Sequence, residues 1–234
     1  MYRCEATSIE GFIQQLAVSY VGNGYWFYVA GSVPEGKDPR IVDAKLIEKY
    51  QIDVSKWRRA RRKRLGLANI QYLRFARFFL LLACGGEHKF FNEEKNIRDV
   101  RRFPIRFAGY SVSYRRGRDE TWHSSVRIEA IEFAVLKAEV LRHALSETVN
   151  TMLSKIRFVP YAPVRNQYRQ LIRAVNKRRK AAGLEPVASE ILLWRRRVVR
   201  AFVERGAGVS VHNLPQIPNA LPSFEQRYAL SSPA

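Results

Sequence analysis

The chain has 234 residues, of which 47% are hydrophobic and 12% aromatic, enough apolar material for one large domain or a domain with a helical extension. This composition excludes a disordered basic tail. Lys and Arg total 41 against 21 acidic residues, for a formal net charge of +20. Because neutralised phosphates release counterions, so large an excess favours a polyanionic partner over a merely soluble basic protein.

Three features of the sequence indicate the cellular compartment of the protein. Cys4 and Cys84 lie far apart without a CxxC spacing, so they offer neither a disulfide framework nor a zinc pattern. Residues 1–5 lack the apolar segment of a secretory signal. The longest apolar run, Phe78–Cys84, is too short to span a bilayer and predicts a buried strand. We therefore expect a cytoplasmic protein without a membrane partner.

The first elements are expected to be a strand and two helices. The apolar, aromatic run over 25–33 follows a glycine-containing turn signal and predicts a strand. Asp38 is a candidate N-cap, with Pro39 at the first position of the helix that follows. Another helix is expected to start near Ser55 and to end by Gly66, a natural C-cap.

The next segments predict further strands. Residues 70–75 and 77–84 predict two strands or one long bent strand, and 88–91 a continuing strand. From 104 to 115, alternating positions predict one more strand. A polar turn then leads to a partner strand around 122–128, so we expect a hairpin.

The hydrophobic period changes after residue 130. Apolar residues recur every three or four positions from 130 to 156, which predicts one long amphipathic helix. We expect a core helix laid across the sheet, the alternative being a dimer seam. A helix is also expected from Pro163 to Gly183, and another from about 189 to 205.

The order of these elements predicts the fold class. Strands come mostly before helices, which favours an α+β fold with an antiparallel or mixed sheet in the N-terminal half, packed by the long helix. We expect an α+β core domain over 1–157 and a basic helical region packed on the core over 158–205. An extended, proline-containing tail is expected over 206–234.

The positive charge is concentrated in two segments. Residues 55–118 contain 18 basic and 4 acidic residues, and residues 158–205 contain 12 basic and 3 acidic residues. The rest of the chain is close to neutral. Such clustering is typical of a binding footprint rather than of a uniformly basic surface.

Residues 56–64 form the densest basic segment, since seven of the nine side chains are cationic. Like charges at helical spacing repel one another, and a polyanion would relieve that repulsion. The alternative is a solvated surface helix anchored by Trp57 and Leu65. The side chains of this segment expected to bind nucleic acid are Lys56, Arg58, Arg59, Arg61, Arg62, Lys63 and Arg64.

The helix after Pro163 carries cations at four-residue spacing, which places them in one stripe. Apolar side chains, among them Leu171 and Val175, are placed to hold its other side on the core. Guanidinium groups take phosphate oxygens bidentately, so such a stripe suits a nucleic-acid backbone. The contacts expected here and from the following helix are Arg165, Arg169, Arg173, Lys177, Arg178, Arg179, Lys180, Arg195, Arg196 and Arg197.

Aromatic residues lie among these cations. We expect most of them in the core, but any that face the basic surface would offer stacking platforms for single-stranded nucleic acid. RNA and DNA, and single and double strands, stay open alternatives. The aromatic residues concerned are Trp57, Tyr72, Tyr110, Tyr114, Trp122, Tyr161 and Tyr168.

Two glycines followed by Glu87, His88 and Lys89 form the strongest candidate for catalysis. An acid and a lysine at this spacing after a strand are found in metal-dependent nucleases, where the acid helps to hold Mg²⁺ or Mn²⁺ and the lysine steadies the attacking water. Such a site needs a further acid. The candidates are Glu93, Glu94, Asp99 and Asp43.

A different chemistry would use His88 with Tyr168. Single-strand endonucleases of the HUH type use two histidines as metal ligands and a tyrosine on a helix as the nucleophile. Here Tyr168 would be the nucleophile, among arginines that could stabilise a phosphotyrosine link, and the second histidine is missing.

The sequence thus predicts a nucleic-acid-binding protein, of DNA or RNA, that needs no cofactor for binding. We expect it to act with other proteins in a nucleoprotein assembly, or in a mobile-element or defence system. One alternative is a metal-dependent nuclease or strand-transfer enzyme centred on residues 87–89. The other is a basic scaffold that binds an acidic protein.

Overall fold

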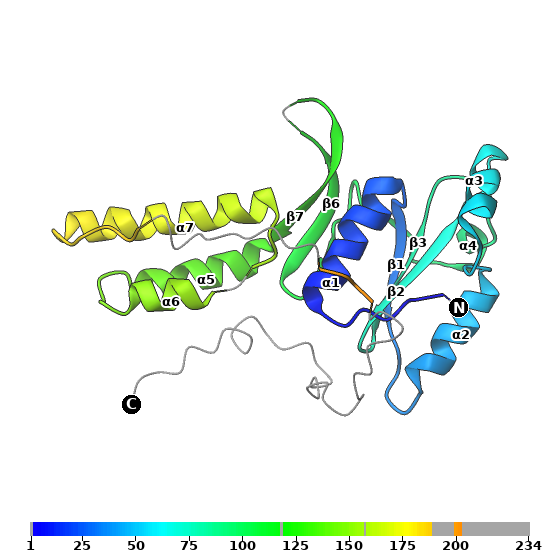
Figure 1. The fold of residues 1–234 in the computed structure, drawn as a ribbon, viewed down its shortest axis with the longest axis horizontal. Coiled ribbons are helices and arrows are strands. Elements are labelled where there is room, and N and C mark those ends of the chain that lie inside the picture. The colour runs from blue at the N-terminus through cyan, green and yellow to red at the C-terminus, as the bar shows by residue number, and fades with distance from the viewer. Residues whose placement is uncertain (1, 118, 157, 189–198, 203–234) are drawn as a thin grey trace. The chain divides into compact units, whose positions relative to one another are not determined.

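The computed structural model describes residues 2–117, 119–156, 158–188 and 199–202 (Figure 1). These residues form seven α-helices and two antiparallel sheets, which confirms the α+β class expected from the sequence. The helix expected over 189–205 lies outside the described residues except for 199–202, and the tail over 206–234 lies wholly outside them. In the described ranges, no helix is both long enough and apolar enough to cross a membrane.

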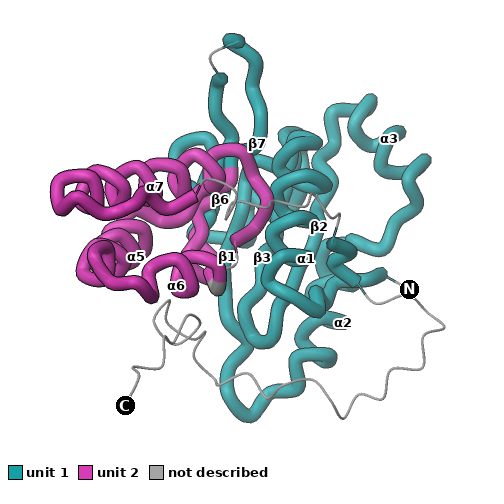
Figure 2. The backbone as a smooth tube through the Cα atoms, turned by 60° about the vertical axis from the view of Figure 1, so that its left-hand side comes forward, with its two compact units in different colours: residues 1–105, 112–125, 198–220 teal, residues 106–111, 126–197, 221–234 magenta. Residues whose placement is uncertain are grey.

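The chain divides into two compact units (Figure 2). Unit 1 holds the described residues of 1–105, 112–125 and 198–220, and unit 2 holds those of 106–111 and 126–197. The three-part division expected from the sequence stays a prediction.

Unit 1 is built on a four-stranded antiparallel sheet with the strand order β2-β3-β1-β4. Leu81 on the central strand β3 pairs with Tyr72 of β2 on one side and with Val29 of β1 on the other. The expected strands over 25–33, 70–75 and 77–84 are confirmed. The strands are β1 (Phe27–Ser32), β2 (Ile70–Phe75), β3 (Phe78–Ala83) and β4 (Arg98–Asp99).

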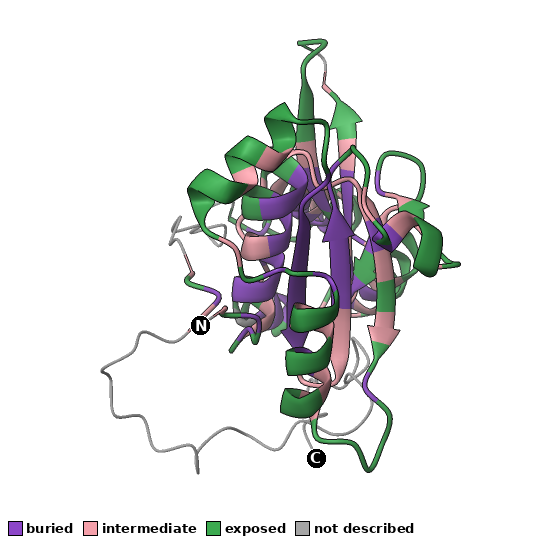
Figure 3. Ribbon diagram, turned by 90° about the vertical axis from the view of Figure 1, so that its right-hand side faces the viewer, coloured by how far each residue is buried: buried purple, intermediate pink, exposed green. Residues whose placement is uncertain are grey.

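Helices cover both faces of this sheet, so β2 is buried along its whole length. Helix α1 (Ile9–Gln14) lies on one face, where the ring of Phe12 contacts those of Phe75 and Phe78 at 6.4 and 6.0 Å between centroids. On the other face Tyr72 and Leu81 belong to a cluster with Tyr50, Ile52 and Phe90. Figure 3 shows the buried residues concentrated along the central strands.

Two helices start where the sequence predicts, each directly after a residue that caps it. The Asp38 carboxylate accepts a hydrogen bond from the backbone N–H of Arg40 at 2.8 Å, and α2 runs over Pro39–Lys49. The Ser55 hydroxyl accepts from the backbone N–H of Arg58 at 3.2 Å, and α3 runs over Lys56–Arg64. Both expected helices are confirmed.

Two expectations about strands are wrong. Residues 88–91 do not extend a strand, because α4 occupies Phe90–Glu93. The strand expected over 104–115 is interrupted at Ala108 and Gly109, where φ is 49° and 75°. These left-handed conformations turn the chain, so an alternating sequence gives two strands. They are β5 (Ile105–Phe107) and β6 (Tyr110–Arg116), which form the second sheet with β7 (Trp122–Ile128), the partner strand of the expected hairpin.

Three helices form the core of unit 2. The single helix expected over 130–156 is wrong, because α5 (Ala130–Arg142) and α6 (Val149–Lys155) are separated by a turn. The helix expected after Pro163 is confirmed as α7 (Ala162–Ala181). Leu136 and Val140 of α5 share one hydrophobic cluster with residues of α6 and α7.

Candidate nucleic-acid interface

Helix α3 is attached to unit 1 without a hydrophobic anchor. All nine of its residues are described, and none is buried. Trp57 is 83% exposed and Leu65 is 65% exposed, so these residues do not anchor the helix as the sequence suggested. An exposed basic helix of this kind needs another means of attachment.

Hydrogen bonds to backbone and side-chain oxygens supply that attachment. Arg59 Nη1 donates to the carbonyl of Val54 at 2.5 Å, and Asn69 Nδ2 donates to the carbonyl of Arg59 at 2.9 Å. Arg62 Nη2 donates to Oε1 of Gln51 at 2.8 Å. Arg59 and Arg62 are half-buried, and these bonds give them a positioning role in addition to their charge.

The other five cations of α3 point into solvent. In the part of the chain that the structure describes, none of the ion pairs includes a residue of this helix. The charge of α3 is therefore uncompensated within the described residues. We define the α3 surface as these exposed side chains: Lys56, Arg58, Arg61, Lys63 and Arg64.

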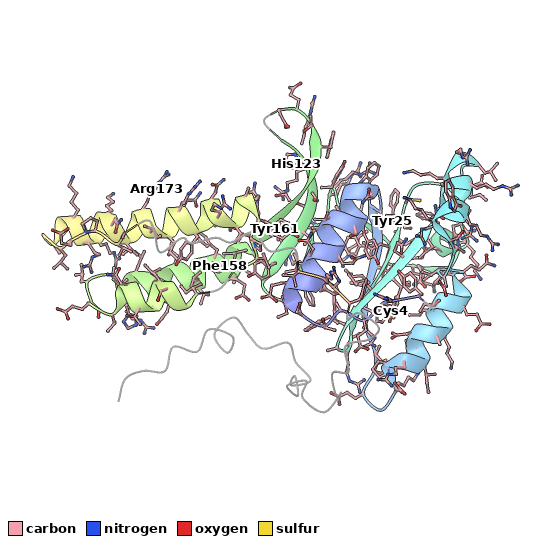
Figure 4. All side chains as sticks on the ribbon, in the orientation of Figure 1. Cys4, Tyr25, His123, Phe158, Tyr161 and Arg173 are labelled. Carbon is pink, nitrogen blue, oxygen red and sulfur yellow. The ribbon has the colours of Figure 1, made fainter. Side chains whose placement is uncertain are left out.

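Helix α7 of unit 2 carries a second row of cations. Arg169, Arg173 and Lys177 are exposed, and Arg165 is half-buried. Figure 4 shows Arg173 on the side of α7 away from α5 and α6. The apolar side of the helix is confirmed, with Val164, Leu171, Ile172 and Val175 all buried. The stripe expected from four-residue spacing is therefore solvent-facing over Arg169, Arg173 and Lys177.

Arg179 has a different place from the one expected. It is only 9% exposed, and its guanidinium donates to the carbonyls of Glu185, Ala144 and Ser146 at 2.6, 3.0 and 3.3 Å. It thus satisfies carbonyl groups in the turn between α5 and α6, and it is not available to phosphates. Arg178 is exposed but donates to the carbonyl of Leu141 at 2.9 Å, and Lys180 is exposed. The expected contacts Arg195, Arg196 and Arg197 lie outside the described residues.

The glycines before Glu87 serve the chain's own backbone. Gly86 has a φ of 129°, and a Cβ atom there would lie 2.4 Å from the carbonyl oxygen of Gly66. The backbone N–H of Glu87 donates to the same carbonyl at 2.9 Å, and the Glu87 carbonyl accepts from Ala68 at 3.0 Å. The close approach that the glycines predict is therefore to residues 66–68, directly after α3, and fixes the position of the C-terminal end of that helix.

The acids proposed to assist Glu87 are engaged elsewhere. Glu93 pairs with Lys49 at 3.1 Å, and Glu94 accepts a hydrogen bond from the Tyr50 hydroxyl. Asp99 and Asp43 pair with other arginines, Arg101 and Arg74, at 2.7 and 2.8 Å. Within the described ranges, no three His, Cys, Asp or Glu side chains are grouped to hold a metal ion. Each acid proposed to assist Glu87 thus has another partner, and the nuclease hypothesis for residues 87–89 stays a prediction.

His88 and Tyr168 are likewise placed for packing. Burial, and then the positive charges of Arg62 and Lys89, lower the pKa of His88, whose Nδ1 accepts a hydrogen bond from the Phe90 N–H at 3.0 Å. Tyr168 is buried and donates its hydroxyl proton to the Leu153 carbonyl at 2.7 Å. A buried hydroxyl bonded in this way is not accessible to a phosphodiester. Tyr72 and Tyr110 are also buried, whereas Tyr114 and Tyr161 are half-buried and Trp57 and Trp122 are exposed, so fewer than half of the seven aromatic residues lie in the core.

A buried charged cluster around Asp43 was not expected. Its carboxylate accepts from Arg74 Nε at 2.8 Å and from the Tyr72 hydroxyl at 2.6 Å, and the Cys4 thiol lies 3.5 Å away. Burial, together with the Asp43 charge, raises the pKa of Cys4 to about 12. The signal in the sequence is the position of Asp43 on the apolar side of α2, three and four residues before Leu46 and Ile47. The cluster ties α2 to the sheet.

Comparison with known proteins gives no family for this chain. No protein-family model matches it, and no curated protein matches its sequence.

Proposed function

We propose that the protein binds nucleic acid through the phosphate backbone, with the α3 surface as the main contact. The observation that supports this is the set of five exposed cations on a helix with no buried residue and no ion pair among the described residues. Like-charge repulsion within α3 is relieved when phosphates approach, and the released counterions supply favourable entropy. The proposal includes both RNA and DNA and needs no metal for binding.

A nucleic acid fits this surface better than an acidic protein does. Protein interfaces place apolar and aromatic side chains at a dry centre from which charged residues are depleted. Helix α3 offers only Trp57 and Ala60 among seven cations. Arginine side chains bind phosphate oxygens bidentately, and the contact stays wet and polar. The α3 surface therefore has the composition of a phosphate-binding surface.

The exposed cations of α7 are proposed as a second contact. Arg169, Arg173 and Lys177 follow one side of the helix at a spacing of four residues, about 6 Å along the helix axis. We also propose a cytoplasmic location, which the two free, buried cysteines support.

Binding of labelled oligonucleotides, followed by fluorescence anisotropy over a range of salt concentrations, tests the proposal. Five phosphate contacts predict a slope of log K against log salt of about −3.5 for single strands and about −4.5 for duplexes. Polyglutamate of matched charge serves as a competitor. Absent binding, a flat salt dependence, or tighter binding of polyglutamate would each contradict the proposed function.

A further inference from the structure

Three aromatic rings and one guanidinium group contact one another in series in unit 1. The ring of Tyr114 on β6 stacks on that of Trp122 on β7, with centroids 5.7 Å apart and planes 18° from parallel. Tyr114 also contacts Trp26, just before β1, at 5.3 Å and 32°. The guanidinium carbon of Arg101 lies 4.5 Å from the centre of the Trp26 ring. We call these four side chains the aromatic row.

The row is held in place from the Arg101 end. Asp99 accepts from Arg101 Nη2 at 2.7 Å and from Nε at 3.0 Å, which fixes the guanidinium over Trp26. This pairing raises the pKa of Arg101, so the group stays charged. Trp26 and Tyr114 are half-buried. The rings are therefore ordered before any ligand arrives, and little side-chain entropy is lost on binding.

The Trp122 end of the row is open. Trp122 is 52% exposed, although an indole is among the side chains that gain most from burial. It precedes His123, which Figure 4 labels on the hairpin of β6 and β7. Arg115 on the same hairpin follows Tyr114 directly in β6 and its Nε donates to the Ser113 hydroxyl at 2.9 Å, so it lies on the face of the strand away from Tyr114 and Trp122. An exposed ring that is stacked on one face by Tyr114 can receive a second flat group on its other face.

We infer that an unpaired nucleobase stacks on Trp122, so that the nucleic acid bound by this protein is single-stranded. The inference rests on the function proposed above. Bases in a duplex have their faces covered by neighbouring pairs, whereas bases of a single strand expose a face to an aromatic ring. Stacking does not depend on base identity, because every base has an aromatic face.

Truncation of the exposed ring tests the inference. The variant Trp122→Ala is compared with Trp122→Phe, which keeps a ring, and with Trp57→Ala, which removes an exposed indole from α3. Stacking of one base predicts that Trp122→Ala lowers the affinity for a single strand by about 5- to 150-fold. The affinity for a duplex of the same sequence should stay unchanged. Trp122→Phe should keep most of the affinity, and Trp57→Ala should lower it less than Trp122→Ala does.

A second readout uses the protein's own fluorescence and does not need the alanine variant to fold. Stacking of a base on Trp122 should quench tryptophan emission when a single strand is added to the native protein. The quenching should fall in Trp122→Phe at saturating oligonucleotide. Equal quenching in the two proteins would overturn the inference, and so would an unchanged single-strand affinity in a folded Trp122→Ala variant.

Neutralisation of the α3 surface separates failure of this inference from failure of the proposed function. When Arg58, Arg61 and Arg64 are changed to Gln, affinity for single strands and duplexes should fall together. If this change weakens binding and Trp122→Ala does not, the base-stacking inference is wrong and the α3 proposal stands. If the native protein binds neither form, both are wrong.

Discussion

Replacement of Arg58, Arg61 and Arg64 by Gln removes three of the five exposed cations of α3 and leaves the attachment of the helix intact. Its anchoring hydrogen bonds come from Arg59, Arg62 and Asn69, which are unchanged. Each phosphate contact contributes about 0.7 to the salt slope for single strands and about 0.9 for duplexes. The triple variant should therefore have a slope that is shallower by about 2 to 3.

This change in slope is large enough to measure by anisotropy. Between about 50 and about 200 mM salt, the native protein should lose roughly 20- to 40-fold more affinity than the triple variant does. The matched control changes Lys37, Arg40 and Lys45 to Gln, an equal loss of charge from exposed residues of unit 1 outside α3. An equal reduction of the slope in the control would show that net charge, and not the α3 surface, drives binding. An unchanged slope in the triple variant would refute the assignment of phosphate contacts to α3.

Three further outcomes concern stability and reactivity. Gly86→Ala should lower the free energy of unfolding, measured in denaturant titrations, by about 1–3 kcal/mol or more. The reason is that φ at this position is 129° and the new Cβ would lie 2.4 Å from the Gly66 carbonyl oxygen. Wild-type stability in this variant would contradict the close approach. Arg179→Ala should lower the free energy of unfolding by about 2–4 kcal/mol, because it leaves three carbonyls unsatisfied. In the control Arg173→Ala, which changes an exposed residue, the free energy of unfolding should change by less than about 0.5 kcal/mol. Equal effects of the two substitutions would refute the buried role of Arg179. Burial raises the pKa of Cys4 to about 12, so iodoacetamide at neutral pH should alkylate this thiol only after unfolding. Because the pKa of Cys4 is higher in the folded than in the unfolded chain, the contribution of this thiol to stability is complete below about pH 9 and is lost as the pH rises further. Rapid alkylation of the native protein would contradict both the raised pKa and this pH dependence.

Local chemistry in the sequence predicts the starts of α2, α3, α5 and α7 and three strands of the first sheet, β1, β2 and β3. Asp38 and Ser55 act as N-caps, as their residue types and positions indicate. The apolar run over Phe78–Cys84 could be recognised as a buried strand because both faces of β3 are covered. These features depend on a few neighbouring residues, and so they can be read without knowledge of the tertiary structure.

The breaks in regular elements could not be predicted in the same way. Ala108 takes a positive φ that its residue type disfavours, and the turn there depends on the surrounding fold. The turn between α5 and α6 is stabilised by the guanidinium of Arg179, more than thirty positions further along the chain. A periodic apolar pattern crosses that turn without interruption, because both helices contribute to the same hydrophobic cluster.

The composition of the candidate site could be predicted from the sequence, but the separate roles of its cations could not. The density of cations over 56–64 identifies the surface, yet nothing in the sequence separates Arg59 and Arg62, which bind backbone and side-chain oxygens, from the exposed cations. The aromatic row shows the same limit of prediction from sequence. Tyr114 and Trp122 lie on adjacent strands and could be paired from the hairpin, whereas Trp26 is remote in sequence.

No side chain of α3 is buried, and this affects how substitutions can alter the binding affinity of the protein. Where residues that contact a ligand also contribute to the core, a change in affinity alters folding as well. On α3 the two properties are separable, since exposed substitutions change stability by only about 0.5 kcal/mol or less. Affinity can thus be raised or lowered residue by residue while the scaffold stays the same. On helix α7 the same freedom is confined to the exposed side, because the other side of the helix carries buried core residues.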